Sequence, residues 1–198
     1  MIRAACATVL LCLAGCAASR PAPRQFDLGD FDALGKRANI VATNLIVAEV
    51  SQPSWMRTRD MFYRLDYESP PRPQRYAINQ WLATPGELVT LRLRQAVQAV
   101  NAGFTLPTSG VSGDYLLESS LDEFTQAFAT PAESRCIVQL RTSLRRTAGV
   151  MVGQRVFRVE IPAPSADASG AALCLASAVN RVSDQIVQWL SVVTVRAP

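Results

Sequence analysis

The second half of the chain alternates apolar and polar residues with the period of two that is typical of β-strands. The alternation covers residues 114–128, 136–145 and 157–161. In the middle segment the apolar positions are Cys136, Val138, Leu140, Thr142 and Leu144, and the polar positions between them are Gln139, Arg141, Ser143 and Arg145. These three segments therefore predict a sheet with one apolar face and one face exposed to water.

The first half of the chain contains shorter apolar segments. Residues 26–31 alternate and predict a short edge strand, and the near-continuous apolar run 40–50 predicts a central strand. Residues 61–67 and 76–78 favour β-structure on either side of a proline-rich stretch at 70–73. The economical interpretation is two strands that form a hairpin with a proline-rich loop.

Two segments carry the 3.6-residue apolar repeat of a helix. Thr84 is predicted as an N-cap, with Pro85 at the first helical position and Glu87 completing a capping box. The stripe that follows is Val89, Leu93, Val97 and Val100, and Gly103 is the expected C-terminal stop. The second stripe is Leu175, Val179, Val182, Ile186, Leu190 and Val193. The predicted fold is α+β, a mostly antiparallel sheet with two long helices packed on one face.

The amino terminus has the pattern of an export signal. Met1-Ile2-Arg3 carries one positive charge, and the apolar run 4–13 is too short to span a bilayer. Leu13-Ala14-Gly15-Cys16 resembles the bacterial lipobox, which implies cleavage between Gly15 and Cys16 and acylation of Cys16. The alternative is an ordinary signal peptide followed by a chance cysteine. We expect residues 1–15 to be the signal peptide, 16–24 the lipidated terminus and tether, and 25–198 one domain.

The amino-acid composition limits the functions that the chain can have. The formal net charge is +4, and the basic residues are scattered among acidic ones, so no nucleic-acid surface is predicted. The chain contains no histidine, which excludes serine–histidine and cysteine–histidine catalysis. Asp122 and Glu123 are adjacent on a predicted strand and are expected on opposite faces, where they cannot act as a pair. We therefore predict no catalytic residue, metal site or cofactor.

Four further residues are candidates for a specific role. Cys136 and Cys174 are an even pair in an exported domain, which favours a disulfide, with two buried thiols as the alternative. Trp55 and Met56 follow a proline and precede a predicted strand, so they lie on a loop. An apolar pair in that position can contact a partner or lipid, although packing beneath the loop is the simpler explanation.

Several motifs in chain order resemble one family. They are Phe26-Asp27-Leu28-Gly29, the apolar run 40–50, Trp55 followed by Met61-Phe62-Tyr63-Arg64, Gln80-Trp81 before the capped helix, and Tyr115-Leu116-Leu117-Glu118 leading to Leu121-Asp122-Glu123-Phe124. Together they resemble the ABC-type transport auxiliary lipoproteins, the PqiC-like proteins, over most of the mature chain. The prolines at 70–73 and the sequence Leu82-Ala83-Thr84 depart from the family pattern, which affects loop detail only.

The resemblance implies a non-enzymatic subunit of an envelope lipid-transport system. The implied partners are an MCE-domain periplasmic protein and an inner-membrane transporter complex. The sequence does not determine the oligomeric state, although a homo-oligomer assembled around a conduit would be mechanically sensible. Ala17 after the lipidated cysteine resembles lipoproteins that are sorted to the outer membrane. The alternative from another class is a lipid-binding carrier or outer-membrane assembly lipoprotein that holds an acyl chain between the helices and the sheet.

Overall fold

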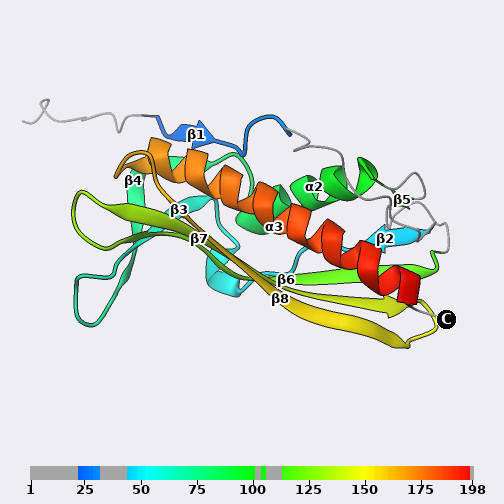
Figure 1. Cartoon of the computed structure of the whole chain (residues 1–198). Helices are drawn as coiled ribbons and strands as arrows, with labels where there is room; N and C mark the ends of the chain where they lie inside the picture. Colours follow the sequence, from blue (N-terminus) through cyan, green and yellow to red (C-terminus); the bar gives the residue numbers. More distant parts are fainter. Residues whose placement is uncertain (1–21, 32–43, 101–103, 106–112, 197–198) are drawn as a thin grey trace, which may run out of the picture.

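A long antiparallel meander forms the centre of the sheet. The computed structural model describes residues 22–31, 44–100, 104–105 and 113–196. Strands β6 (Tyr115–Phe128), β7 (Ser134–Arg146) and β8 (Met151–Pro162) pair in order, and Gly149 takes a φ of 95° in the turn between the last two. The three strands predicted from alternation are confirmed, and they run the length of the molecule (Figure 1).

The other side of β6 is shared by two short strands. Strand β2 (Leu45–Val47) pairs parallel with its first half, and β3 (Asp60–Leu65) pairs parallel with its end. Strand β4 (Pro73–Trp81) completes the predicted hairpin with β3 and also pairs with the edge strand β1 (Arg24–Phe26). With β5 (Phe104–Thr105) beside β2, the sheet has eight strands. It is mixed, because the long pairings are antiparallel and the short ones at β1, β2 and β3 are parallel.

Only part of the predicted central strand at 40–50 can be compared with the structure, and within residues 44–50 it is shorter than predicted. Residues 40–43 lie outside the described residues, and the strand within 44–50 is Leu45–Val47. Val47 is paired with Leu117 and Ser51 with Ser120, so residues 47–51 lie opposite only 117–120. The extra residue breaks the ladder, and the N–H of Val50 donates instead to Thr90 Oγ1 in the next helix, at 2.8 Å.

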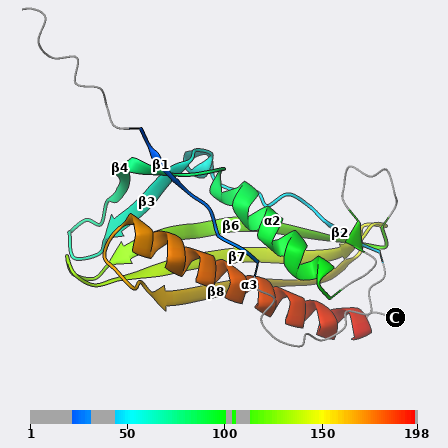
Figure 2. The same ribbon diagram turned by 90° about the horizontal axis from the view of Figure 1, so that it is seen from above.

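Both predicted helices are present and lie on the same face of the sheet (Figure 2). Helix α2 (Pro85–Gln98) follows a short 3₁₀ turn η1 (Ser54–Met56) and the β3–β4 hairpin, and helix α3 (Ala168–Arg196) ends the described chain. Thr84 and Glu87 form the predicted capping box. Helix α2 ends at Gln98, earlier than predicted, and Gly103 lies outside the described residues.

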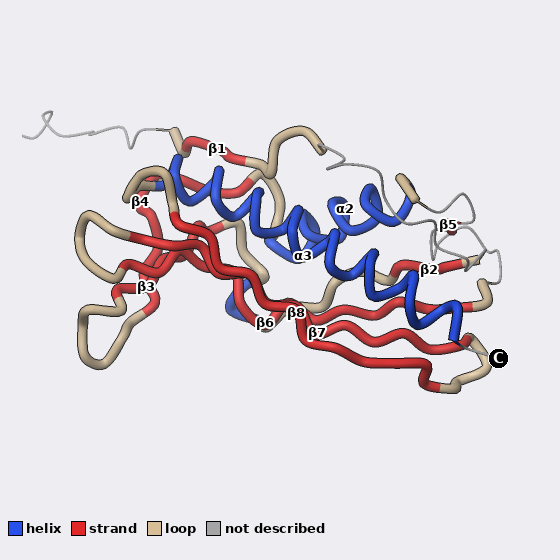
Figure 3. The backbone as a smooth tube through the Cα atoms, viewed as in Figure 1, coloured by secondary structure: helices blue, strands red, loops and turns tan. Residues whose placement is uncertain are grey.

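The helices and the sheet enclose one apolar core (Figure 3). Its fully buried members include Val89 and Leu93 from α2, Leu121 from β6, and Val182 and Ile186 from α3. A disulfide joins Cys136 of β7 to Cys174 of α3, with their Cα atoms 5.7 Å apart. No helix in the described part of the chain is long and apolar enough to cross a membrane.

Candidate functional site

The predicted anchor precedes the described residues. Gly15 and Cys16 both lie before Ala22, the first described residue, so the structure does not place them. The first strand begins at Arg24, eight residues after Cys16. A chain of that length spans at most about 30 Å, so an acylated Cys16 would keep the domain close to a membrane surface.

The adjacent residues Trp55 and Met56, which were one candidate contact in the sequence, differ in their exposure to solvent. The Trp55 side chain is 50% exposed, and its ring meets the edge of Phe62 at a centroid distance of 5.5 Å. Met56 is 1% exposed and belongs to the core. The side chain of Met56 therefore offers no contact surface, because the 3₁₀ turn directs it inward, and Trp55 alone stays a candidate contact.

A groove of about 600 Å³ lies between the segment after β2 and the start of α2. Its polar lining comes from Glu49, Ser51, Gln52, Arg57, Thr84, Glu87, Thr90 and Arg94. Gln52 fixes the groove wall, since its Nε2 donates to Thr84 Oγ1 at 3.1 Å and its Oε1 accepts from the N–H of Gly86 at 2.8 Å. A Cβ at Gly86 would lie 2.8 Å from Gln52 Cδ, so a larger residue here would force the Gln52 amide to move.

The charges in this groove balance. Arg57 and Arg94 face Glu49 and Glu87 in the lining, and Arg94 also donates to the carbonyl of Val47. Hydrogen bonds from the backbone and side chain of Thr84 lower the pKa of Glu87, so this carboxyl is ionised at neutral pH. With no net charge, the groove suits a mixed polar and apolar protein surface better than a simple anion.

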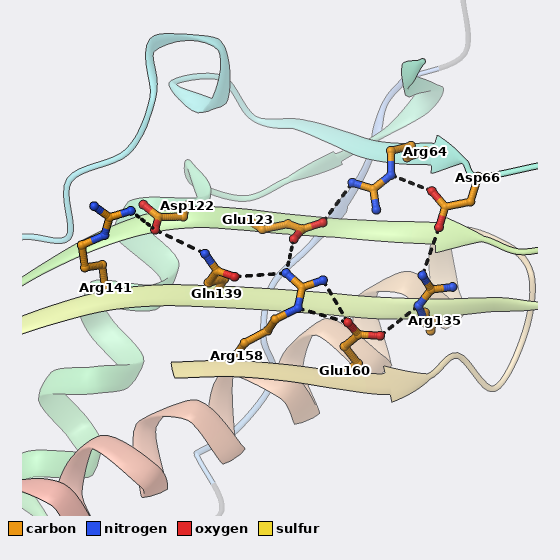
Figure 4. A network of polar contacts seen from close by, with 9 residues as sticks. All are labelled: Arg64, Asp66, Asp122, Glu123, Arg135, Gln139, Arg141, Arg158 and Glu160. Atoms are coloured by element: carbon orange, nitrogen blue, oxygen red, sulfur yellow. Dashed lines mark hydrogen bonds and ion pairs between the residues drawn. The ribbon is translucent and has the colours of Figure 1, made fainter. Parts of the chain in front are cut away.

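The open face of the sheet carries a closed ring of alternating charges (Figure 4). In order around the ring, the members are Arg64, Asp66, Arg135, Glu160, Arg158 and Glu123, and they come from β3, β6, β7, β8 and the residue after β3. The ion pairs of Arg64 measure 2.7 Å to Asp66 and 2.9 Å to Glu123, and those of Arg135 measure 3.0 Å to Asp66 and to Glu160. The side chains are 20–40% exposed, so water screens the ring only partly.

The ring shifts the titration of its members. The hydrogen bond from Arg158, followed by that from Arg135, lowers the pKa of Glu160. Hydrogen bonds to Asp66 and Glu123 raise the pKa of Arg64, and those to Glu123 and Glu160 raise the pKa of Arg158. These three groups are thus held in their charged forms, and the ring links strands that are not neighbours in the sheet.

A β-bulge overturns the prediction that Asp122 and Glu123 face opposite sides. Leu121 pairs with Leu140 and Glu123 pairs with Gln139, which leaves Asp122 as an extra residue on β6. Asp122 therefore turns to the open face, where it accepts from Arg141 at 3.1 Å, while Glu123 joins the ring. Both carboxylates are engaged by guanidinium groups, so their chemical role is ion pairing rather than acid–base catalysis.

Arg92 is a buried residue that the sequence pattern did not single out. It is 3% exposed, and its guanidinium donates to the carbonyls of Leu28, Gly29 and Asp30 and to Asn180 Oδ1, at 2.7–3.1 Å. Burial lowers its pKa. Arg92 of α2 thereby joins the segment after β1 to both helices. One feature of the sequence does indicate that Arg92 is buried: it lies three residues after Val89, which places it beside the apolar stripe of the helix.

In the described residues no group of three or more His, Cys, Asp or Glu side chains could hold a metal ion. The arrangement is that of an α+β domain with two surface grooves and a ring of ion pairs on the open face of its sheet. The chain matches the ABC-type transport auxiliary lipoprotein components over residues 30–187, and it belongs to this family. No curated protein matches the chain.

Solved structures share the fold. Protein XCC0632 from Xanthomonas campestris is 18% identical, with a TM-score of 0.77 over 87% of this chain and 97% of that one. An uncharacterised protein is 13% identical, with a TM-score of 0.67 over 86% of this chain and 99% of that one. The hypothetical protein CT253 from Chlamydia trachomatis is 6% identical, with a TM-score of 0.50 over 79% of this chain and 100% of that one. At these identities the likeness concerns the fold alone.

Proposed function

We propose that this protein is a non-enzymatic subunit of an envelope lipid-transport system, tethered to the outer membrane through Cys16. In this role it docks a periplasmic conduit built from an MCE-domain protein and supplied by an inner-membrane ABC transporter. The family match over residues 30–187, behind a lipobox, is the observation that carries the proposal. Ala17 after the cysteine supports sorting to the outer membrane.

The packing of the domain favours docking over lipid carriage. A carrier would hold an acyl chain between the helices and the sheet. In the described residues that space is filled by side chains with 0% exposure, among them Val89, Leu140 and Ile186. The two grooves described for this domain lie at its surface instead, one beside α2 and one beside α3. An acyl chain would have to displace well-packed core residues at a cost of several kcal/mol.

Membrane fractionation tests the anchor. Cys16→Ser blocks acylation, so we expect the mature protein to move from the outer-membrane fraction to the soluble periplasmic fraction with its fold unchanged. Cys12→Ser, which changes a cysteine within the predicted signal peptide, is the matched control and should leave the protein in the outer membrane. Retention of the Cys16→Ser protein in the membrane after the signal peptide has been removed would refute the proposed anchor.

Crosslinking in intact cells tests the docking. We expect the tagged protein to recover an MCE-domain protein after formaldehyde treatment, together with further copies of itself if several subunits surround the conduit. Trp55→Ala should lower that recovery, whereas Leu173→Ala, an exposed change on α3, should not. Recovery of no MCE-domain protein would contradict the docking role. Native mass spectrometry of the delipidated protein tests the carrier alternative, which requires a retained lipid.

A further inference from the structure

Strand β8 is a long free edge of the sheet. Among the described strands it pairs only with β7, and its other side borders no strand (Figures 1 and 3). It contains 12 residues, whereas an ordinary strand has about 5–6. Every second residue of such an edge points its backbone N–H and C=O groups outward, and these groups form a template for another strand.

A groove of about 510 Å³ runs along this edge, between β8 and the second half of α3. Its lining consists of Arg155, Val156, Phe157, Arg158, Gln185, Gln188, Trp189 and Val192. Val156 and Val192 are 51% and 49% exposed, so both the strand and the helix present apolar side chains. A Cβ at Gly153 would lie 3.1 Å from the Trp189 ring, which shows how closely the two elements approach at one end of the groove.

The groove carries one positive charge that no described carboxylate compensates. Its lining contains two arginines and no carboxylate. Arg158 belongs to the charge ring, but Arg155 forms no ion pair with the described residues, and its guanidinium lies 5.3 Å from the centre of the Phe157 ring. Arg181 is exposed on α3 one turn before Gln185 and therefore lies on the same side of the helix.

We propose that β8 and α3 together bind an extended segment of a partner protein, which adds to the sheet as a further strand. The bound segment places acidic side chains on the helix side of the sheet, at Arg155, and apolar side chains on the opposite side, against Val156. Backbone hydrogen bonds to β8 supply the affinity and the charge supplies the selectivity. This inference goes beyond the proposed function, because strand addition at β8 does not depend on the partner's role in transport.

A second copy of the chain fits the groove less well. Among the described residues, the other free strand edges are β1, with 3 residues, β5, with 2, and the part of β4 before Asn79, which does not pair with β1. All of them are shorter than the 12 residues of β8. A second β8 would bring another Arg155 and Arg158 to a groove that already lacks carboxylates. Charge complementarity therefore favours an acidic partner segment.

Peptide binding to the purified full-length mature protein tests the proposal. The probe is a fluorescent ten-residue peptide of alternating valine and glutamate, and the matched control peptide has lysine in place of glutamate. We expect the acidic peptide to bind at least tenfold more tightly by anisotropy. It should also slow amide exchange at alternate residues of β8 at least tenfold.

Charge reversal identifies the site of binding. Arg155→Glu should weaken the acidic peptide at least tenfold, whereas Arg59→Glu, an exposed change before β3, should have no effect. Equal binding of the two peptides, protection away from β8, or an unchanged affinity in Arg155→Glu would overturn the proposal. Protection of β8 that rises with protein concentration in the absence of peptide would assign the edge to contacts between copies, and this too would overturn it.

Discussion

The two faces of β7 show two different ways of stabilising one strand. On the face covered by α3, Cys136, Val138, Leu140, Thr142 and Leu144 are all fully buried. On the open face, Arg135, Gln139 and Arg141 are partly exposed and make ion pairs and hydrogen bonds with neighbouring strands. Burial needs only apolar residues at the right period, whereas each polar contact needs two particular partners in a particular geometry.

The two faces also differ in how much they contribute to stability and in which strands they connect. Burial of one leucine contributes about 2 kcal/mol, whereas an exposed ion pair contributes about 0–1 kcal/mol. The covered face therefore supplies most of the stability. The ring on the open face instead connects β3 to β7 and β8, although β3 pairs with β6 over only three residues, 63–65. We infer that the ring mainly fixes the orientation of the β3–β4 hairpin.

The largest effect is expected on the covered face. Leu140→Ala should lower the free energy of unfolding by about 3 kcal/mol, because it leaves a cavity in a fully buried position. Arg141→Ala, the next residue on the opposite face, should cost less than about 1 kcal/mol. Urea denaturation followed by circular dichroism measures both values. Similar losses in the two variants would remove the distinction between the faces.

The covalent link on the covered face is expected to rank next. Replacing Cys136 and Cys174 together with alanine should lower the free energy of unfolding by about 2–3 kcal/mol, since the unfolded chain gains conformational freedom. Thermal unfolding with and without reductant measures this effect. The reductant should destabilise the unmodified protein and leave the double variant unchanged. Insensitivity of both proteins would mean that the two cysteines are free thiols.

A smaller effect is expected from the ring. Glu123→Gln should cost about 1 kcal/mol, because Glu123 is the ring member that bridges Arg64 and Arg158. Glu118→Gln is the matched control, since Glu118 is on the same strand and pairs only with Arg145 outside the ring. Amide exchange should rise across the β3–β4 hairpin in Glu123→Gln alone. An equal response in both variants would refute the orienting role of the ring.

The smallest effect is a dependence on pH. The pKa of Glu160 is lower in the folded protein than in the unfolded chain, so its stabilising contribution is complete above the unfolded value of about 4.3. That contribution is lost as the pH falls through the lower folded value. Between pH 5 and pH 3 the unmodified protein should therefore lose more stability than Glu160→Gln. Parallel pH profiles in denaturation experiments would contradict this linkage.

The covered face could be predicted from the sequence because its signals are local and redundant. The capping residues Thr84 and Glu87 and the alternation along β7 each determine structure within a few neighbouring positions. No local sequence signal of this kind specifies the register in which two distant strands pair. The shortening of the predicted strand within residues 44–50 and the outward turn of Asp122 both result from one extra residue in a ladder, which depends on the partner strand.

The candidate contacts were less predictable than the fold. Trp55 and Met56 are adjacent in one short turn, and only the structure shows which of them is buried. Arg92 meets the carbonyls of Leu28, Gly29 and Asp30, more than 60 residues earlier in the chain. Backbone carbonyls occur at every residue, so no side-chain pattern could have indicated that contact.

The position of α3 has a consequence for biosynthesis. It follows β6, β7 and β8 in the sequence, and it covers their apolar face (Figure 2). A polypeptide that emerges from its amino terminus completes these strands before their cover exists. During that interval the nascent sheet exposes an aggregation-prone surface, and a holdase chaperone would be most valuable until the residues of α3, Ala168–Arg196, arrive.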